Sequence, residues 1–412
     1  MAKKIDIHNY EYRVNQCIRS IEKANISNKN KELIFEFKDA CFIEGLTKAR
    51  ISRLLSTMKL MAQRLEKDFD KANKKDIIKL VQEIHTNENY AYLTKHTHKV
   101  ILKKFYKWLK GNNETYPEEV SWIEGKIKRS QLSLPSEEGL LTEKEVKKVV
   151  KTATGLRDKA LISVLYESGC RIGEVMSCRI NNVTFDKHGC SLVVNGKTGS
   201  RKVRIIASTP YLANWIEHHP FKEDRESPLW VNLGNNQKSP FMNYSATVRV
   251  IQRLFKKAGI NKKCNPHLFR HSRATFLANY LTEFQMNHYF GWIQGSDMPA
   301  TYVHMSGKDV DNALLDVYGI EKIKRKESTL RPKRCPRCET LNGYNNKFCN
   351  KCGGVLDLQK AMELEHEQQN EKETKQVTDI ILGALMKDSE MQQLIERKIP
   401  ELKLKEEINK LN

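Results

Sequence analysis

The sequence lacks a hydrophobic run that approaches the roughly 20 apolar residues of a membrane span. Its first residues, MAKKIDIHNYEYR, also lack the apolar stretch of a signal peptide. Both absences argue against a membrane-spanning or secreted protein. We therefore expect a soluble protein of the cytoplasm, and its 412 residues leave room for about two or three domains.

Acidic residues are scarce relative to basic ones, at 50 against 71, which gives a formal net charge of +21. Such an excess of positive charge indicates a polyanionic partner, most often nucleic acid. A basic ribosomal or histone-like protein would share this charge. The composition therefore favours nucleic-acid binding without separating DNA from RNA.

The ten cysteines lack the even spacing of a disulfide framework. Most are scattered among apolar residues, which is typical of reduced thiols in a protein core. The others form two CxxC pairs in CPRCETLNGYNNKFCNKC, residues 335–352. Two disulfides or free thiols would fit the same count, but two CxxC turns can complete a tetrahedral zinc site, and a closed site of this kind is structural, not catalytic. The predicted zinc ligands are Cys335, Cys338, Cys349 and Cys352.

Helical periodicity organises the first part of the chain. ISRLLSTMKLMAQRL and VILKKFYKWLKGN place apolar side chains at three- and four-residue steps. The stretch from NETYPEEV to SLPSEEG contains prolines and loses this periodicity, which indicates a linker. We therefore predict a helical domain over residues 1–112 and a linker over residues 113–139.

A second domain begins near residue 140. Thr142 and Glu145 have the spacing of a capping box, and the helical pattern of RDKALISVLYESG ends at a glycine. VTFDKHGCSLVVNGKTGSRKVRIIAS then alternates like β-strands around a turn at GKTG, and helical patterns resume afterwards. The predicted fold class is mainly α with a small antiparallel β-sheet. Its further parts are an α+β domain over 140–325, a four-cysteine zinc ribbon over 333–356 and a charged helical tail over 357–412.

The stretch NPHLFRHSRATF, residues 265–276, combines a helix start with anion-seeking groups. Asn265 suits an N-cap, and Pro266 suits the first helical turn. His267 and Arg270 then share one face near the positive end of the helix dipole. This arrangement predicts an anion-binding site.

Further candidates follow one another along the second domain. Taken alone, Arg171 and Glu174 read as a surface ion pair, Lys197 as an exposed turn lysine and Tyr302 as a half-buried aromatic. Their order favours another interpretation. Arg, then Lys in a hairpin, then HxxR, then Gly-Trp and then Tyr resembles the tyrosine recombinase or phage integrase family, of the Xer and Cre kind.

The resemblance rests on four segments. GCRIGEV resembles the family's first arginine box, NGKTGSRK its lysine hairpin, HLFRHSRATFL its HxxRH box, and FGWIQGSDMPATYVH its LGH…Y segment. Trp292 stands where Xer-type members carry His and Cre-like members carry Trp. The resemblance covers residues 140–320 and, more loosely, the helical domain, which looks like the family's core-binding domain on DNA. The ribbon is similar to an addition in archaeal mobile-element integrases.

The resemblance implies cleavage and rejoining of DNA through a covalent intermediate. Arg171 and Arg270 would neutralise a scissile phosphate with charge that does not titrate. Tyr302 would attack the phosphorus and form a 3′-phosphotyrosyl link, which requires neither ATP nor a catalytic metal. The other implied roles are general acid for Lys197, proton handling for His267, phosphate bonding or packing for Trp292, and support of a cationic neighbour for Glu174.

The resemblance also implies double-stranded DNA and further copies of the chain as partners. We expect a homotetramer on paired DNA sites and a monomer or weak dimer without DNA, because a charge of +21 repels itself. The segment DVDNALLDVYGI, residues 309–320, is the candidate for exchange between copies, although it would also suit a cap on its own domain.

Three other interpretations fit parts of the sequence. A recombinase-derived DNA-binding regulator without cleavage activity would keep the charge and the ribbon. A metal-dependent nuclease would need clustered carboxylates near the basic box, and a type IB topoisomerase would share the chemistry without a choice of site. For the ribbon, we expect contact with DNA or a partner and no part in cleavage, so that residues 1–330 would still cleave.

Overall fold

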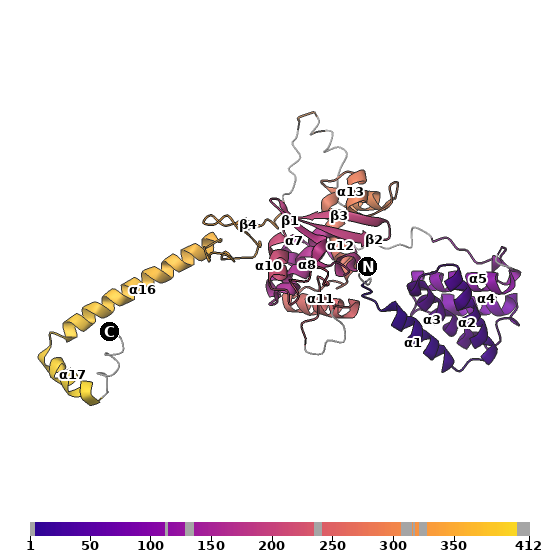
Figure 1. Ribbon diagram of the computed structural model, residues 1–412, viewed down its shortest axis with the longest axis horizontal. Helices are drawn as coiled ribbons and strands as arrows, with labels where there is room; N and C mark the ends of the chain where they lie inside the picture. Colours follow the sequence, from indigo (N-terminus) through magenta and orange to yellow (C-terminus); the bar gives the residue numbers. More distant parts are fainter. Residues whose placement is uncertain are drawn as a thin grey trace.

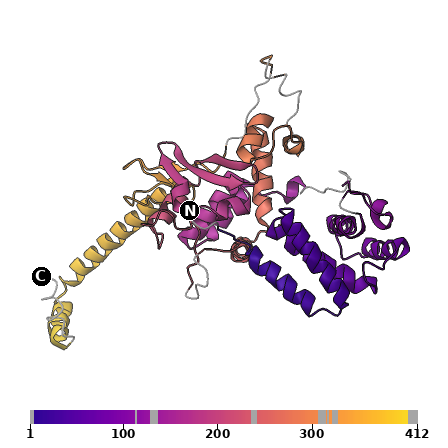
Figure 2. The ribbon, with the colours of Figure 1, turned by 45° about the vertical axis from the view of Figure 1, so that its right-hand side comes forward.

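The computed structural model confirms a mainly helical chain with a small antiparallel sheet. An N-terminal helical body lies on one side of a second body, and a long C-terminal helix leaves the second body on the other side (Figures 1 and 2). The structure describes residues 5–111, 114–127, 136–234, 241–305, 315, 318–320 and 328–401.

Apolar side chains at helical spacing build the core of the N-terminal helical body. The stripe predicted in ISRLLSTMKLMAQRL is buried, including Leu55 and Met58. Phe105 packs edge-on against Phe37, with the ring centres 5.1 Å apart. The helices of this body are α1 (Tyr10–Glu22), α2 (Asn28–Ile43), α3 (Lys48–Leu65), α4 (Lys74–Thr86), α5 (Tyr92–Lys110) and α6 (Glu118–Ser121).

The predicted linker over 113–139 begins too early. Pro117 is the N-cap of α6, and Val120 and Ile123 are buried in the core of the helical body. Lys110 holds the same segment through an ion pair with Glu119 at 2.9 Å. Pro117 was misleading because proline is well tolerated where a helix begins, since its missing N–H is not needed there.

The beginning of the predicted helical domain is also wrong. Ile7 is buried in the core of the second body, and its carbonyl accepts a 2.9 Å hydrogen bond from the backbone N–H of Tyr244. The His8 ring packs against the Tyr244 ring, with the centres 4.7 Å apart. The chain therefore crosses from the second body to the helical body just before α1.

The second body packs helices around a three-stranded antiparallel sheet in the order β1-β2-β3. The hairpin between β2 and β3 closes with Gly196 opposite Gly199, so that Lys197 and Thr198 form the turn, as predicted. The strands are β1 (Val183–Asp186), β2 (Gly189–Gly196) and β3 (Gly199–Ile205). The helices are α7 (Glu143–Thr152), α8 (Leu156–Ser168), α9 (Ile172–Met176), α10 (Thr209–Glu217), α11 (Tyr244–Ala258), α12 (Pro266–Ala278), α13 (Glu283–Phe290) and α14 (Met298–Met305), with short 3₁₀ turns η2 (Glu137–Gly139) and η3 (Ile180–Asn182).

Local signals fix where the helices near the site begin and end. The Asn265 side chain accepts the backbone N–H of Leu268 and caps α12, as predicted. The predicted capping box at Thr142 is also present. Gly169 ends α8 in the left-handed conformation, with φ at 55°, and a Cβ there would lie 2.6 Å from the Phe290 ring. Glycine is therefore required where α8 turns into the following arginine segment.

The cysteine-containing segment is docked onto the second body. It contains the short strands β4 (Lys333–Arg334) and β5 (Leu341–Asn342). Tyr344 is buried in the second body's core, where its hydroxyl lies 3.3 Å from that of Ser163 in α8. Asn345 adds two hydrogen bonds, because its backbone N–H donates to the Tyr211 hydroxyl and its Nδ2 donates to the Lys147 carbonyl.

A close backbone approach makes this docking possible. A Cβ on Gly343 would lie 2.3 Å from the Tyr211 ring, so only glycine fits there. A chain cut at residue 330 would lose Tyr344 from the core of the second body. We therefore revise the expectation that residues 1–330 retain cleavage.

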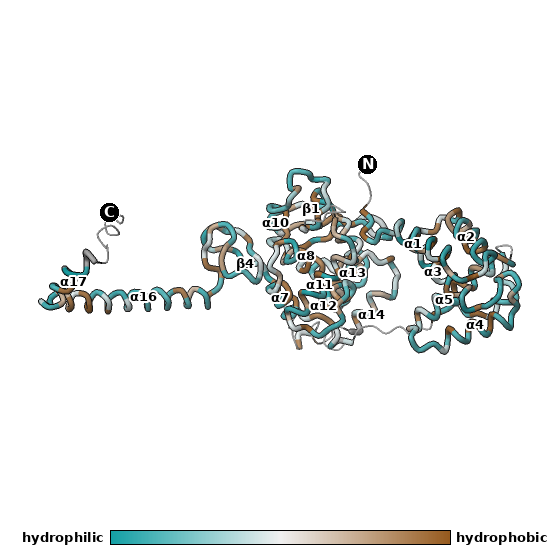
Figure 3. The backbone as a smooth tube through the Cα atoms, turned by 90° about the horizontal axis from the view of Figure 1, so that it is seen from below, coloured by the Kyte–Doolittle hydropathy of each residue, from teal (hydrophilic) through white to brown (hydrophobic). Residues whose placement is uncertain are grey.

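The C-terminal helix α16 (Leu358–Leu385) projects away from the second body, and α17 (Ser389–Glu401) follows it. Figure 3 shows that apolar residues interrupt an otherwise hydrophilic tail, and no side chain of α16 is buried. None of the helices in the described part of the chain is both long and apolar enough to cross a bilayer. The candidate exchange segment, residues 309–320, lies mostly outside the described residues.

We expect Tyr344→Ala to lower the free energy of unfolding of the second body by about 3–5 kcal/mol, as for other buried aromatics truncated to alanine. Urea unfolding followed by the fluorescence of the buried Trp215 and Trp230 would measure this change. Tyr318→Ala, at an exposed tyrosine, is the control and should leave the midpoint unchanged. A wild-type midpoint for Tyr344→Ala would show that the ribbon does not support this core.

Candidate active site

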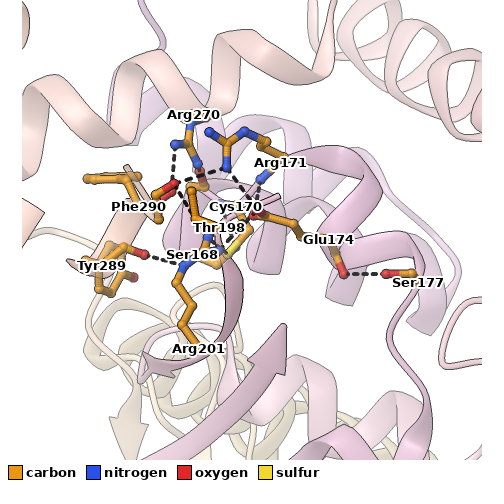
Figure 4. A network of polar contacts seen from close by, with 12 residues as sticks. Ser168, Cys170, Arg171, Glu174, Ser177, Thr198, Arg201, Arg270, Tyr289 and Phe290 are labelled. Atoms are coloured by element: carbon orange, nitrogen blue, oxygen red, sulfur yellow. Dashed lines mark hydrogen bonds and ion pairs between the residues drawn. The ribbon is translucent and has the colours of Figure 1, made fainter. Parts of the chain in front are cut away.

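Arg270 is the buried centre of the site. It lies on α12, only 5% exposed, and Figure 4 shows its guanidinium next to that of Arg171. Its Nη1 donates to the Gly169 carbonyl at 3.0 Å and its Nη2 to the Phe290 carbonyl at 2.7 Å. The guanidinium carbon also lies 5.2 Å from the ring centres of Phe290 and Trp292. Its hydrogen-bond acceptors are therefore neutral.

A buried charge with neutral partners is costly unless an anion compensates it. Among the described residues, no carboxylate forms an ion pair with Arg270. Burial, and then the positive charge of Arg171, lower the pKa of Arg270 to about 10, so it still carries its charge at neutral pH. The pair of guanidinium groups is thus arranged to receive an anion from outside the protein.

Arg171 is the more accessible of the two arginines. It is the N-cap of α9, and its backbone N–H donates to Oε2 of Glu174 at 2.9 Å. Its Nη1 donates to Oε1 of Glu174 at 3.1 Å and to the Gly291 carbonyl at 3.4 Å. The side chain is 32% exposed, so part of the guanidinium faces solvent. The buried Glu174 carboxylate therefore accepts hydrogen bonds from both the backbone and the side chain of Arg171.

Tyr302 is stacked inside the site. Its ring on α14 lies parallel to the indole of Trp292, with centres 5.4 Å apart and planes 6° apart. Its hydroxyl shares a 2.7 Å hydrogen bond with Nδ1 of His271. The residue is only 1% exposed, and burial raises the pKa of Tyr302 although the Arg270 charge acts in the opposite direction. The phenol is therefore protonated at neutral pH.

Two histidines lie on the same face of α12. His267 and His271 are one turn apart, with ring centres 6.4 Å apart. Burial, and then the charges of Arg270 and Arg171, lower the pKa of His267. Burial, and then His267 and Arg270, lower the pKa of His271. Both rings are therefore neutral at pH 7, and each can accept a proton.

A cleft of about 640 Å³ opens beside these histidines. Its wall includes the lysines Lys262 and Lys263, which precede α12. Nζ of Lys262 donates to Glu145 at 2.9 Å and to the Leu140 carbonyl. The cleft thus gives solvent access to the two histidines, and its wall carries both lysines and Glu138.

Lys197 occupies a different position from the other predicted site residues. It is exposed at the turn between β2 and β3. Its neighbour Thr198 reaches the site, where its Oγ1 donates to the Gly291 carbonyl at 3.3 Å. The structure therefore brings the lysine hairpin to the site and leaves the lysine itself on the outside.

Two residues of the site had no assigned role in the sequence. His271 lies in the HxxRH box, and its spacing of four from His267 was the signal that could have found it. Arg201 on β3 donates to both carboxylate oxygens of Glu174, at 3.1 and 2.8 Å. Strand alternation gave no indication of this contact.

The four cysteines of the ribbon come together as predicted. Their Sγ atoms all lie within 4.8 Å of one another, and the pairs Cys335–Cys352 and Cys338–Cys349 are each 3.6 Å apart. Zinc–sulfur bonds of about 2.3 Å in a tetrahedron require sulfur separations of about 3.8 Å. The backbone N–H of Lys351 also donates to Cys349 Sγ at 3.4 Å, which favours a thiolate. This cluster fits a metal ion such as zinc.

Comparison with known proteins agrees with the geometry. Residues 140–308 match the phage integrase family. The chain is 28% identical over 256 residues to the tyrosine recombinase XerA of Pyrococcus horikoshii. The aligned region covers 60% of this chain and 80% of that protein.

Solved structures extend the likeness to the fold. A crystal structure of the XerH site-specific recombinase bound to palindromic difH substrate, a post-cleavage complex, has a TM-score of 0.53 at 17% identity. The likeness covers 77% of this chain and 98% of that one. A lambda integrase dimer bound to a COC′ core site has a TM-score of 0.52 at 14% identity, covering 68% of this chain and 78% of its own. Residues 140–308 therefore belong to the phage integrase family, and the chain as a whole is similar to tyrosine recombinases of the Xer kind.

Proposed function

We propose that the protein is a site-specific DNA recombinase that cleaves and rejoins strands through a 3′-phosphotyrosyl intermediate on Tyr302. The observation that carries the proposal is the buried Arg270, which has neutral hydrogen-bond partners and lies next to Arg171. A DNA phosphate supplies the anion that Arg270 lacks among the described residues. The names of the relatives, which are recombinases and integrases on DNA sites, support the same reaction.

The reaction is a transfer of the phosphoryl group between two oxygens. Arg171 and Arg270 hold the non-bridging oxygens as negative charge grows on them. The Tyr302 oxygen forms a bond to phosphorus while the bond from phosphorus to the 5′-oxygen breaks. The phenolic proton passes to Nδ1 of His271, 2.7 Å away, and the leaving oxygen takes a proton from Lys197. Attack by the 5′-hydroxyl of another strand reverses these steps.

The hairpin and the aromatic stack must adjust when DNA binds. Lys197 is exposed at the hairpin turn, and Tyr302 is almost fully buried against Trp292. Bound DNA therefore has to draw the hairpin inward and free the tyrosine ring.

Because one phosphodiester is exchanged for a phosphotyrosine of similar energy, the reaction uses neither ATP nor a catalytic metal. Trp292 contributes its indole N–H or its packing surface, since it cannot shuttle protons.

The partners in this proposal are duplex DNA and further copies of the chain. Strand exchange between two duplexes requires four cleavages, so one site per chain gives a tetramer on paired sites. A lambda integrase tetramer bound to a Holliday junction provides a precedent with a similar fold. In this proposal the helical body contacts the duplex together with the second body, and the chain remains a monomer or weak dimer without DNA.

We expect Tyr302→Phe to bind DNA and to form no covalent adduct. A duplex taken from the sequence flanking the gene, nicked so that the short cleaved end diffuses away, traps the adduct on a denaturing gel. Tyr280→Phe, on the same body, is the matched control and should form the adduct at the wild-type rate. An adduct that persists in Tyr302→Phe would contradict the assignment of the nucleophile.

The rate of adduct formation should depend on pH through the neutral histidines. Because burial lowers the pKa values of His267 and His271 below that of a free imidazole, both rings are mainly neutral between pH 8 and pH 7. We expect a flat rate over this range and a fall at lower pH, where the proton acceptor becomes charged. His271→Gln should lower the plateau about 100-fold. A wild-type rate that already falls between pH 8 and pH 7 would argue against a neutral histidine as acceptor.

The metal of the ribbon is zinc in this proposal, and it is structural. We expect one zinc ion per chain by elemental analysis, and none after Cys335→Ser combined with Cys338→Ser. Cys264→Ser should keep the metal. Because Tyr344 ties the ribbon to the second body, removal of zinc by a chelator should also lower the unfolding temperature of that body. An unchanged unfolding temperature after complete metal loss would contradict the structural role.

A further inference from the structure

Arg201 forms a buried ion pair behind the proposed phosphate site. Its side chain is 7% exposed, and that of Glu174 is 3% exposed. Nη1 donates to Oε1 and Nη2 to Oε2 of Glu174, at 3.1 and 2.8 Å, which is the two-pronged geometry of the strongest arginine–carboxylate pairs. Figure 4 shows Arg201 reaching the carboxylate from below, while Arg171 and Arg270 lie above it.

The backbone around this pair leaves no room for other side chains. A Cβ on Gly196 would lie 2.4 Å from Oε1 of Glu174. Gly291, with φ at 61°, would place a Cβ 2.6 Å from Nη1 of Arg201. A glycine at the end of β2 and a glycine at the end of α13 thus make room for this ion pair. The local backbone is therefore adapted to the ion pair.

The hydrogen bonds of Arg201 leave it unable to bind phosphate itself. Besides the two bonds to Glu174, its Nε donates to the Tyr289 carbonyl at 2.9 Å and its Nη2 to Cys170 Sγ at 3.5 Å. Arg171, in contrast, uses only its Nη1 for side-chain hydrogen bonds to the described residues. The outer donors of Arg171, Nε and Nη2, therefore make no hydrogen bond to the described residues, and the side chain is 32% exposed.

We propose that Arg201 is a positioning residue: it satisfies the Glu174 carboxylate so that Arg171 keeps its outer donors for the DNA phosphate. The inference rests on the proposed function and adds a residue to it. Without Arg201, the buried carboxylate would have Arg171 as its remaining cationic partner. Arg171 would then rotate into a two-pronged pair with Glu174, and its outer donors would turn away from the phosphate.

Electrostatics agree with this division of roles. Burial would raise the pKa of Glu174, but the hydrogen bonds and charge of Arg201, followed by the bonds from Arg171, lower it below the usual value. The carboxylate therefore stays ionised inside the protein. An ionised, buried carboxylate needs a permanent cation, and Arg201 supplies it without occupying the phosphate site.

The position of Arg201 in the sheet adds a second consequence. Arg201 pairs with Val194 across the hairpin whose turn carries Lys197. Its bonds to Glu174 and to Tyr289 tie this hairpin to α9 and to α13. Arg201 thus anchors the hairpin close to its turn, two residue pairs from Gly196 and Gly199, while Lys197 in the turn remains exposed.

The test compares Arg201→Met and Arg201→Lys with Arg204→Gln. Arg204 lies on the same strand and pairs with Asp186 at the surface, which makes it a matched control. On the nicked duplex we expect Arg201→Met to form adduct about 100-fold more slowly and Arg201→Lys to be intermediate, since ammonium cannot make the two-pronged contact. Arg204→Gln should match the wild type.

A second substrate separates positioning from a general loss of structure. Replacing one non-bridging oxygen of the scissile phosphate by a methyl group removes its charge and the need for a complete arginine clamp. The defect of Arg201→Met should shrink at least tenfold on this substrate, and Glu174→Gln should partly restore Arg201→Met on normal DNA. An equal defect on both substrates, without rescue, would overturn the proposal.

A third measurement does not depend on DNA cleavage. Inorganic phosphate, at constant ionic strength, should raise the unfolding temperature of the wild type in a saturable way. Arg201→Met should need at least tenfold more phosphate for half of this effect, and Arg204→Gln should not. If the wild type never forms an adduct but these phosphate results hold, the proposed function fails and the positioning role stands. Equal phosphate binding in Arg201→Met and the wild type would refute the positioning role.

Discussion

The site depends on the buried positive charge of Arg270, with which no carboxylate among the described residues forms an ion pair. Arg270 is held by the carbonyls of Gly169 and Phe290 and by the faces of two aromatic rings. These partners orient a guanidinium without cancelling its charge. Gly169 has to be glycine so that α8 can end in a left-handed turn and present its carbonyl there. The constraint explains why several elements converge on this arginine.

The need to hold Arg270 rigidly gives distant segments of the chain, such as the ribbon, a role in the site. The helix that ends at Gly169 also carries Ser163, whose hydroxyl meets Tyr344 of the ribbon. The ribbon therefore supports α8, and α8 positions an acceptor for Arg270. On another side of this body, Ile7 joins its core before the chain enters the helical body. A site that must hold a buried charge benefits from such supports, because rigid acceptors cost no rearrangement when the anion arrives.

Sequence patterns predicted the structural features that depend only on contacts between residues a few positions apart. The cap at Asn265, the turn at Lys197 and the spacing of Arg171 from Glu174 all appear in the structure as expected. The CxxC pairs also assembled as predicted, because each pair is made by one local turn.

Contacts between distant residues carried no comparable signal. Arg201 looked like an ordinary strand residue, and its function comes from Glu174, 27 positions away. Tyr344 lies 181 positions from Ser163, so nothing local showed that the ribbon belongs to the second body. The predicted domain boundaries near Ile7 and Val120 were wrong for the same reason, because each of these residues is buried in a core formed by distant segments of the chain.

Mass spectrometry of the trapped protein–DNA adduct tests the central claim most directly. After digestion of the DNA and the protein, the peptide that spans residues 274–308 should carry one nucleotide, since it follows Arg273 and ends at Lys308. This peptide also contains Tyr280 and Tyr289, so fragmentation can assign the modified position. We expect the nucleotide on Tyr302, joined through its 3′-phosphate. A nucleotide on either of the other tyrosines, or on a peptide from elsewhere in the chain, would contradict the account.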